Sequence, residues 1–406
     1  MSRVVIIGGG AAGLMSACIA ARNGKEVLLI EKNEKLGKKI YITGKGRCNL
    51  TNDVLPIEFF GNVVSNPKFL YSCINVFSPK DTMDYFESLG LKLKTERGNR
   101  VFPLSDKASD VTKALEKEIY KQSVEVLLNT TVSKINVVDG KITNVVANEK
   151  THVCDSVIVC CGGISYPTTG STGDGYKFAK ALGHSVVDLR PALVGIELCG
   201  DKFKEAQGVS LKNVRLKCKC CDKVVFEEFG EMLFTHFGVS GPIVLSCSSL
   251  INRKAPNDLK LYIDLKPALD NDTLEKRLLR EFSENKLKDL ATTMRSLLPK
   301  SLIGIVLTQA EVKQSKKCSE ITIEERKRII VALKELRFSV KKLRPIDEAI
   351  ITSGGVNVKE INPKTMESKI VTGLYFAGEV IDVDAFTGGF NLQLAFSTGY
   401  VAGLNC

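Results

Sequence analysis

The sequence contains no run of about 18 uninterrupted apolar residues, the length that a membrane-spanning helix needs. We therefore expect no transmembrane helix and no membrane partner. The first apolar segment, residues 4–21, carries four glycines, a pattern that predicts a strand, a turn and a helix instead of an export signal. Apolar residues make up 44% of the 406 positions and charged residues 25%, which is typical of a folded protein of two or three domains.

A disulfide framework and a paired metal site are also missing from the sequence. The 13 cysteines are odd in number and scattered through strand-like contexts, so reduced thiols in a cytoplasmic protein are the simplest interpretation. The run Cys218-Lys219-Cys220-Cys221 lacks the second pair of ligands that a zinc site needs. We interpret these residues as strand cysteines and predict no metal site.

Aromatic residues are scarce where positive charge is concentrated. The net charge is +11, and residues 271–345 hold 18 Lys and Arg against 10 Asp and Glu. A solvated helical surface explains this excess, and attraction of an anionic substrate or of a nicotinamide phosphate is the alternative. We do not favour a nucleic-acid partner, because few aromatic residues lie among these charges, and no obligate protein partner is inferred.

The two ends of the chain have α/β texture, and the middle differs from them. Residues 4–7 and 27–30 are buried, β-branched runs on either side of a small-residue helix at 11–22, the pattern of a Rossmann half-unit. Helical spacing also extends over residues 68–89 and 109–122, and residues 156–161 read as a further buried strand. Residues 192–265 alternate in short runs that predict strands.

The helical period of the middle region begins after residue 270. Its predicted apolar faces carry Leu274, Leu278, Phe282, Leu287, Leu290, Met294 and Leu297. We divide the chain into a first α/β part at 1–188, a β-rich domain at 189–270 and a helical insert at 271–335. A return strand of the β-rich domain at 336–349 and a C-terminal part of the α/β domain at 350–406 complete the division.

The first glycine motif follows the first predicted strand. Gly8, Gly10 and Gly13 have the spacing that permits a tight turn, close approach of a pyrophosphate, and close packing of helix on strand. The following residues, Ala11 and Ala12, open a helix whose free N–H groups face the phosphates. Glu31 ends the next strand, where a carboxylate accepts hydrogen bonds from an adenosine ribose. This acid favours NAD or FAD over NADP at the site.

A second glycine-rich strand-to-helix turn lies at the far end of the chain and favours FAD over NAD. The buried run at residues 374–377 ends in Gly378-Glu379, and Asp382 follows. The residues Gly388, Gly389, Phe390, Asn391 and Leu392 then open an apolar helix. We expect the carboxylate to bind ribityl hydroxyls and the helix start to donate N–H groups to the flavin carbonyl edge, which becomes negative on reduction.

With these motifs the chain resembles the BaiN/YhiN family of NAD(P)/FAD-dependent oxidoreductases, also called aminoacetone oxidase-like flavoproteins. The resemblance covers essentially the whole chain and rests on five segments: residues 8–13, 44–52, 162–167, 235–242 and 376–393. It implies an α/β fold, a glutathione-reductase-type FAD-binding Rossmann domain interrupted by a β-barrel-like domain and a small helical domain. It also implies that one class of members reduces unsaturated 3-oxo bile acids.

The resemblance further implies which positions line FAD. Beyond the glycine motifs, these are Ala12, Glu31, Lys32, Arg47, Cys48, Asn49, Val132, Gly162, Glu379 and residues 390–392, and Gly163 shares the turn of Gly162. The redox dithiol of disulfide reductases is not available, because the next cysteine after Cys48 is Cys73. We interpret Cys48 as a packing or backbone-turn residue of this loop.

A second G-x-G-x-x-G unit for a nicotinamide domain is absent, so we expect that NADH or NADPH visits the flavin transiently or that another electron donor replaces it. The favoured function is an FAD-dependent oxidoreductase that passes hydride from NAD(P)H to a small molecule such as an unsaturated 3-oxo bile acid or similar enone. The alternatives are a flavin oxidase of a small amine or ketone, and a non-catalytic flavin- or nucleic-acid-binding protein. Tyr166 and His236 are candidate proton donors, and each has a structural role as its alternative.

Overall fold

The computed structural model describes residues 2–406 and divides them into two compact units. One unit comprises the chain up to Pro191 together with Ile346–Cys406, and the second comprises Ala192–Pro345. Each unit has its own hydrophobic core. No helix among residues 2–406 is long and apolar enough to cross a membrane.

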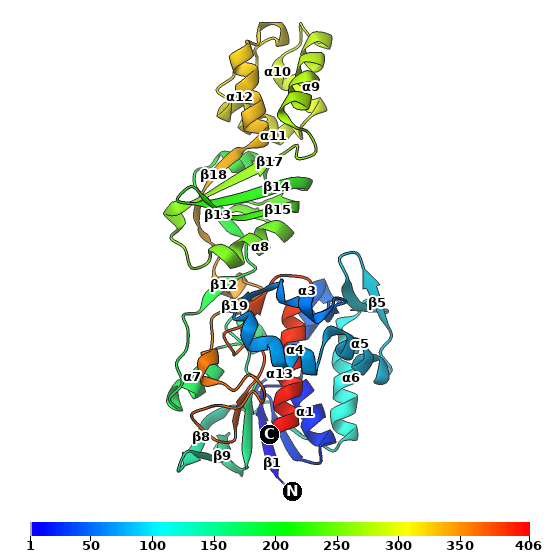
Figure 1. Ribbon diagram of the computed structural model, residues 1–406, viewed down its shortest axis with the longest axis vertical. Helices are drawn as coiled ribbons and strands as arrows, with labels where there is room; N and C mark the ends of the chain where they lie inside the picture. The colour runs from blue at the N-terminus through cyan, green and yellow to red at the C-terminus, as the bar shows by residue number, and fades with distance from the viewer. Residues whose placement is uncertain (1) are drawn as a thin grey trace. The chain divides into compact units, whose positions relative to one another are not determined.

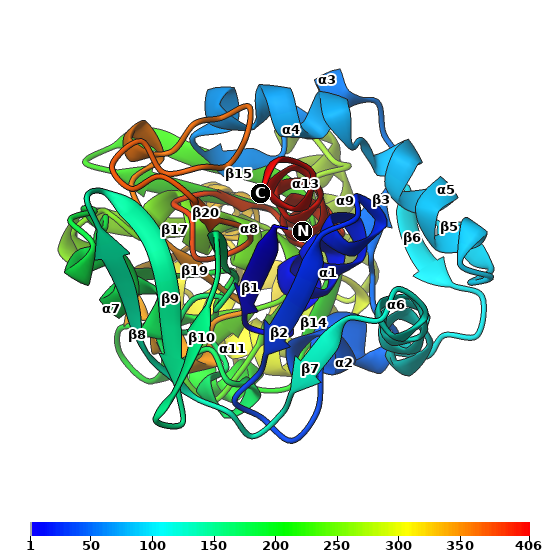
Figure 2. The same cartoon turned by 90° about the horizontal axis from the view of Figure 1, so that it is seen from below.

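The first unit is built on a parallel sheet in the order β20-β11-β1-β2-β7. Its strands are β1 (Arg3–Ile7), β2 (Glu26–Ile30), β7 (Glu125–Leu127), β11 (Ser156–Val159) and β20 (Leu374–Phe376). The β-branched run of β1 is fully buried at Val4, Val5 and Ile6 because the strand has neighbours on both edges and cover on both faces. Figure 2 shows β1, β2 and β7 side by side.

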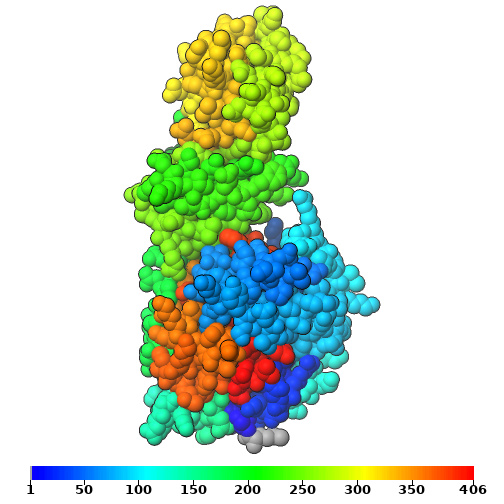
Figure 3. All heavy atoms as spheres, viewed as in Figure 1, coloured from blue at the N-terminus to red at the C-terminus, as the bar shows by residue number. Residues whose placement is uncertain are grey.

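Two helices from opposite ends of the chain pack against each other in this unit. They are α1 (Ala11–Arg22) and α13 (Phe390–Asn405), and both are rich in small residues. A Cβ atom on Gly399 would lie 2.5 Å from the Ala12 carbonyl oxygen, and one on Gly403 would lie 2.6 Å from the Ser16 carbonyl oxygen. The α13 glycines therefore permit a close approach to the α1 backbone. Figure 1 shows the pair, and blue and red segments adjoin on the surface of this unit in Figure 3.

The remaining elements of the first unit surround this centre. The helices are α2 (Lys38–Ile42), α3 (Pro56–Phe60), α4 (Tyr71–Val76), α5 (Pro79–Ser88), α6 (Ala108–Lys121) and α7 (Asp174–Ala181). The strands are β3 (Thr51–Asn52), β4 (Val63–Ser65), β5 (Leu93–Glu96), β6 (Arg100–Pro103), β8 (Val132–Val138), β9 (Lys141–Ala147), β10 (Lys150–Val153), β12 (Arg190–Ala192), β19 (Ile351–Ser353) and β21 (Asp384–Ala385). The chain leaves at β12 and returns at β19, and these two strands pair.

The helical spacing over residues 68–89 corresponds to two helices, because the segment is broken between α4 and α5. Ser78 caps α5: its hydroxyl accepts from the Asp81 N–H at 3.2 Å, and its own N–H donates to the Asp81 carboxylate at 2.8 Å. Pro79 then occupies the first turn, where its missing N–H costs nothing. A capping box and a proline together start a new helix at this point.

The second unit is a closed barrel with helices packed into the same core. The barrel order is β13-β16-β15-β14-β17-β18, with β13 (Ile196–Leu198), β14 (Ser210–Cys220), β15 (Lys223–Phe234), β16 (Gly238–Ser240), β17 (Leu259–Asp264) and β18 (Leu336–Leu343). The helices are α8 (Pro242–Ile251), α9 (Asn271–Glu284), α10 (Leu290–Thr293), α11 (Lys300–Gln309) and α12 (Ile323–Lys334). The predicted fold class, an α/β Rossmann fold with a barrel and a helical part, is confirmed.

Leu287 does not share the apolar face predicted for the region after residue 270. Leu274, Leu278 and Phe282 are buried on α9. Helix α9 ends at Glu284, so Leu287 lies in the following turn with 84% of its surface exposed. The apolar residues of the sequence keep a helical spacing past the end of the helix, but the backbone is no longer helical there.

Candidate functional site

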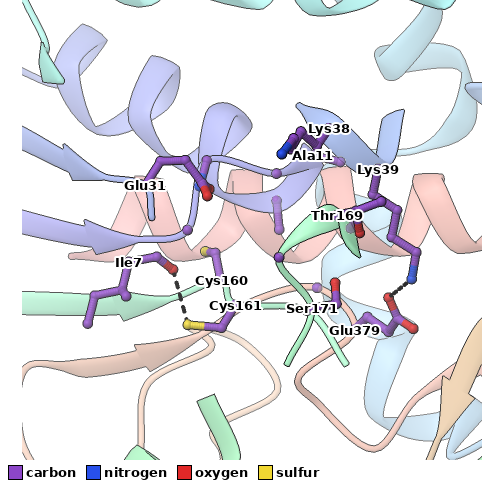
Figure 4. Close-up of a pocket in the computed structure, with 18 of the residues that line it drawn as sticks. Ile7, Ala11, Glu31, Lys38, Lys39, Cys160, Cys161, Thr169, Ser171 and Glu379 are labelled. Carbon is purple, nitrogen blue, oxygen red and sulfur yellow. Dashed lines mark hydrogen bonds and ion pairs between the residues drawn. The ribbon is translucent and has the colours of Figure 1, made fainter. Parts of the chain in front are cut away.

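A pocket lies where four parallel strands of the first unit end. Its lining includes residues that directly follow β1, β2, β11 and β20: Gly8, Glu31, Cys160 and Ala377. Ligands of open α/β sheets collect at the carboxyl ends of the strands, where the helices that follow also begin. Figure 4 shows labelled side chains from all of these segments around the pocket. All residues lining it belong to the first unit.

The three motif glycines are required for different reasons. Gly8 has a φ of 104°, and a Cβ atom there would lie 2.6 Å from the Cys160 carbonyl oxygen. A Cβ atom on Gly13 would overlap the Gly8 carbonyl oxygen. Gly10 has extended backbone, and a Cβ atom on it would have nothing within 4 Å. The protein itself thus demands the first and third glycines, whereas the second leaves open space beside the pocket.

Two helix N-termini meet this pocket without a side-chain cap. Helix α1 starts after Gly10, helix α13 starts after Gly389, and neither start has a capping hydrogen bond from a side chain within residues 2–406. Ala11 and Ala12 of α1 line the pocket. Asn391 and Leu392 of α13 line it as well. Free N–H groups and two positive helix-dipole ends therefore face the same cavity, which suits a ligand with phosphates and carbonyl oxygens.

Glu31 is buried at the end of β2 and is held by backbone donors. Its carboxylate accepts from the Gly9 N–H at 2.7 Å and from the Asn33 N–H at 2.8 Å. The Asn33 side-chain amide also donates to the same carboxylate oxygen at 2.6 Å, so the other oxygen, Oε2, keeps acceptor capacity for a ligand hydroxyl. The geometry is that expected for a ribose-binding acid.

The next residue, Lys32, is engaged with the protein. Its ammonium group contacts the Asp174 carboxylate at 2.7 Å and the Thr172 hydroxyl. Burial raises the pKa of Asp174, but hydrogen bonds from Lys32, Lys177 and Thr172 outweigh this effect and lower it to about 2. Lys32 thus lines the pocket as half of an ion pair.

Glu379 is a further carboxylate in the pocket wall, and it pairs with Lys39. The Lys39 ammonium lies 2.6 Å from Glu379 Oε2 and donates to the Ser165 hydroxyl at 2.7 Å. Glu379 Oε1 accepts from the Thr352 N–H at 2.8 Å and from Ser165 Oγ at 3.0 Å. The dashed line in Figure 4 marks the Lys39–Glu379 pair. This network orients one carboxylate edge with α2, β19 and the turn after β20.

Two thiols line the pocket but are protected from reaction. Burial raises the pKa of Cys160 to about 12 and raises the pKa of Cys161 well above its usual range. The Cys161 thiol donates to the Ile7 carbonyl oxygen at 3.6 Å. Neutral thiols are poor nucleophiles, so these cysteines serve as small apolar wall residues.

The pocket brings together most of the residues predicted from the two glycine motifs and from the family resemblance. These are Gly8, Gly10, Ala11, Ala12, Glu31, Lys32, Val132, Gly162, Gly378, Glu379, Asn391 and Leu392. The predicted residues that do not line it are Gly13, Arg47, Cys48, Asn49, Gly163, Asp382, Gly388, Gly389 and Phe390. Gly13 and Gly389 act one layer behind the wall, because their missing side chains let α1 and α13 begin where they do.

The loop of residues 47–49 is engaged elsewhere in the first unit. Arg47 pairs with Glu96 and Asp106 and covers the Phe102 ring at 4.2 Å. Cys48 is fully buried, and burial raises the pKa of its thiol to about 12. The Asn49 Oδ1 atom is buried with no hydrogen-bond partner in residues 2–406.

Asp382 and Phe390 are also occupied by the protein. The Asp382 carboxylate accepts from the Asn66 side-chain amide at 3.0 Å. The Phe390 ring packs edge-on against Phe59 at 5.3 Å. Both side chains therefore contact other parts of the first unit and not the pocket, and they hold the second glycine turn in place.

The two candidate proton donors lie in different units. Tyr166 is half-buried in the first unit, has a φ of 49°, and stands three residues before Thr169, which lines the pocket. His236 is exposed in the second unit, between β15 and β16, with its ring edge-on to Phe237 at 5.1 Å. Neither residue lines the pocket.

Sequence reasoning missed several lining residues, including Lys39, Thr43, Cys160, Cys161, Ser171 and Thr352. Cys160 and Cys161 are the last two residues of the predicted strand at 156–161, so the rule that ligands collect at strand ends could have found them. Lys39 and Thr352 carry no such signal, because tertiary structure alone brings them to Glu379.

Comparison with known proteins supports this description. The model of the HI0933-like protein Rossmann domain matches residues 2–405. The 3-dehydro-bile acid delta(4,6)-reductase of Clostridium scindens is 32% identical over 99% of this chain and 98% of its own. The ribosomal RNA dihydrouridine synthase of Haemophilus influenzae is 32% identical over 100% of this chain and 98% of its own.

A solved structure shares the fold at low identity. The 3-ketosteroid-delta4-(5alpha)-dehydrogenase from Rhodococcus jostii RHA1 superposes with a TM-score of 0.55 at 14% identity and covers 100% of this chain and 96% of its own. With the family match over nearly the whole chain, the predicted class of FAD-dependent oxidoreductase is confirmed at the level of the family. The chain belongs to the HI0933-like family of Rossmann-fold proteins.

Proposed function

We propose that this protein is an FAD-dependent reductase that saturates a carbon–carbon double bond conjugated to a carbonyl group. The observation that supports FAD as the cofactor is the pocket itself, which has two uncapped helix N-termini, open space at Gly10, and the carboxylates Glu31 and Glu379. Helix α1 and Gly10 suit the pyrophosphate, Glu31 the adenosine ribose, Glu379 the ribityl chain, and the α13 start the flavin carbonyl edge.

The class of bond follows from what two relatives have in common by name. A 3-dehydro-bile acid delta(4,6)-reductase and a dihydrouridine synthase take different substrates. Saturation next to a conjugated carbonyl is common to both products, because dihydrouridine is uridine with two hydrogens added across C5=C6. We propose the same bond change for the present protein.

FAD bound in this pocket would supply a hydride that originates from NADH or NADPH. The chain holds the cofactor by the donors named above, and the helix dipole of α13 favours the charge that the flavin gains on reduction. The alkene receives the hydride at one carbon and a proton at the other. Tyr166, His236 or water donates that proton in this proposal.

Separate half-reactions test the two proton donors. If Tyr166→Phe or His236→Ala removes the donor, reoxidation of the reduced flavin by the acceptor slows at least about tenfold. Reduction by NAD(P)H changes little, because that step needs no acid. Equal slowing of both half-reactions would assign the residue a structural role, and no slowing of either would return the proton transfer to water.

A uridine in ribosomal RNA is the second candidate substrate, and the charge of the second unit favours it. Residues 271–345 carry 18 cationic against 10 anionic side chains. Several of the cations are exposed: Lys276, Arg280, Lys286, Lys288, Arg295 and Lys300. Exposed lysines and arginines bind phosphates with a steep dependence on salt. The first candidate, an unsaturated 3-oxo bile acid or similar enone, needs no such surface.

One anaerobic experiment separates these candidates. The protein is purified, its released cofactor is identified as FAD or FMN, and bleaching of the flavin by NADH and by NADPH is measured. The reduced enzyme is then mixed with an unsaturated 3-oxo bile acid, with unmodified ribosomal RNA, or with neither. Reoxidation by the bile acid supports the enone, and formation of dihydrouridine supports the RNA. Reoxidation by neither acceptor, followed by fast reoxidation once oxygen is admitted to the sample, would overturn the reductase in favour of an oxidase.

Binding gives an independent measure of the RNA candidate. The double variant Lys286→Gln, Lys288→Gln should lower the slope of log K against log salt by about one to two units if both lysines contact phosphate. The double variant Lys80→Gln, Lys94→Gln removes the same charge from the first unit and serves as the matched control. Equal slopes for all three proteins would contradict RNA contact at these lysines.

A further inference from the structure

The sequence offers no partner for the adjacent cysteines Cys220 and Cys221, but the folded second unit supplies one. The two thiols and the carboxylate of Asp258 place their ligand atoms within 4.8 Å of one another. Cys221 and Asp258 are exposed, and Cys220 is half-buried. All three residues belong to the second unit, apart from the flavin pocket described above.

The barrel fixes the relative positions of these residues. Cys220 ends β14 and pairs in register with Leu259, the first residue of β17. The Cys221 N–H donates to the Asp258 carbonyl oxygen at 3.1 Å, which extends the ladder by one residue. Cys221 and Asp222 form the two-residue turn to β15, with φ values of 47° and 64°. The ligands therefore stand on adjoining strand ends of a closed barrel and need no loop rearrangement to meet.

We propose that Cys220, Cys221 and Asp258 form a binding site for a thiophilic divalent cation of the zinc class. Two sulfur ligands and one carboxylate oxygen match the preference of zinc for tetrahedral sulfur, nitrogen and oxygen sites, and solvent water fills the fourth position. Binding deprotonates each thiol, so the metal takes two thiolates and the two protons pass to the solvent.

Two thiolates and a carboxylate at these distances repel one another, and a divalent cation bound between them would stabilise all three groups at once.

The test measures metal binding to the reduced, full-length holoprotein after treatment with a chelator. Cadmium is titrated while the ultraviolet absorption of thiolate-to-metal charge transfer is recorded, and zinc affinity is measured by competition with a coloured chelator. Cys199→Ser removes another exposed cysteine of the second unit and is the matched control. Far-ultraviolet circular dichroism and flavin content establish that each variant is folded.

Wild type and Cys199→Ser should bind one equivalent with the thiolate signal. Cys220→Ser and Cys221→Ser should each lose that equivalent, and Asp258→Asn should weaken zinc binding by about tenfold or more, since even outer-shell changes at metal sites cost that much. The proposal is overturned if Cys221→Ser retains the signal, if Asp258→Asn binds zinc as wild type does, or if wild type binds no cadmium through thiolate.

Discussion

At the scale of single residues, the glycine loop separates what the fold requires from what the ligand requires. Gly10→Val should give a folded protein that binds no FAD. The added side chain would occupy open space, where it disturbs no protein atom but takes the position that the pyrophosphate needs. Gly13→Ala should lower the stability of the protein itself, since its Cβ atom meets the Gly8 carbonyl oxygen. Flavin absorbance after gel filtration and the thermal unfolding midpoint measure the two effects. Full FAD occupancy in folded Gly10→Val would place the cofactor elsewhere.

A buried histidine gives a second prediction at this scale, on the pH dependence of stability. His184 packs edge-on against Phe376, bonds to the Ser368 hydroxyl at 2.8 Å, and has its pKa lowered below 6.5 by burial. Below about pH 6.5 the histidine is protonated in the unfolded chain but still neutral in the folded chain. The free energy of unfolding therefore decreases as the pH falls from 6.5 towards the folded-state pKa of His184.

Urea unfolding at about pH 7 and about pH 5.5 checks this effect. Wild type should lose more free energy of unfolding between these two conditions than His184→Gln, which keeps an amide for Ser368 and carries no titrating group. Parallel losses in the two proteins would remove His184 as the cause.

At the scale of elements, the contact between α1 and α13 connects both ends of the pocket. Gly399 lies against Ala12, which lines the pocket, whereas Gly403 lies one turn further on, against Ser16. Either glycine changed to Ala should force the helices apart and cost about 1–3 kcal/mol of stability. Gly399→Ala should also weaken FAD binding, because it displaces the N-terminal turn of α1. Thermal unfolding and FAD titration of the apoprotein measure the two effects.

The exposed neighbour Leu404 provides the control for this pair. Leu404→Ala should leave stability and FAD affinity close to those of wild type, since its side chain is 45% exposed. If Gly399→Ala and Gly403→Ala weakened FAD equally, general loosening of the unit would explain the loss better than displacement of α1.

At the scale of the whole molecule, the first unit should hold the flavin by its own residues. Its core is separate, every residue lining the pocket belongs to it, and β12 and β19 pair where the chain leaves and returns. Replacing residues 195–345 with a Gly-Ser linker of about six residues should therefore give a folded protein that still binds FAD. A folded but colourless product would contradict the assignment of the FAD site to this unit.

The sequence alone determined the parts of the site that are local. Residues 4–31 specify strand, glycine turn, helix and acid by spacing, and the structure has α1 at the predicted residues 11–22 with Glu31 buried at the end of β2. The glycine turn before α13 could be predicted from the sequence in the same way. Such features follow from backbone sterics and hydrogen bonding between near neighbours, so no distant contact is needed to recognise them.

Tertiary structure decided whatever depends on residues distant in the chain. Lys39 reaches Glu379 across 340 positions, and Asp258 reaches Cys221 because β14 and β17 pair in the barrel. The structure also adds the contacts behind the predicted roles of the motif glycines, since a Cβ atom on Gly13 would overlap a backbone carbonyl oxygen and one on Gly10 would meet open space. A sequence pattern shows which residues are present, whereas sheet order and helix packing decide which of them are in contact. The pocket and the proposed metal site both depend on such contacts.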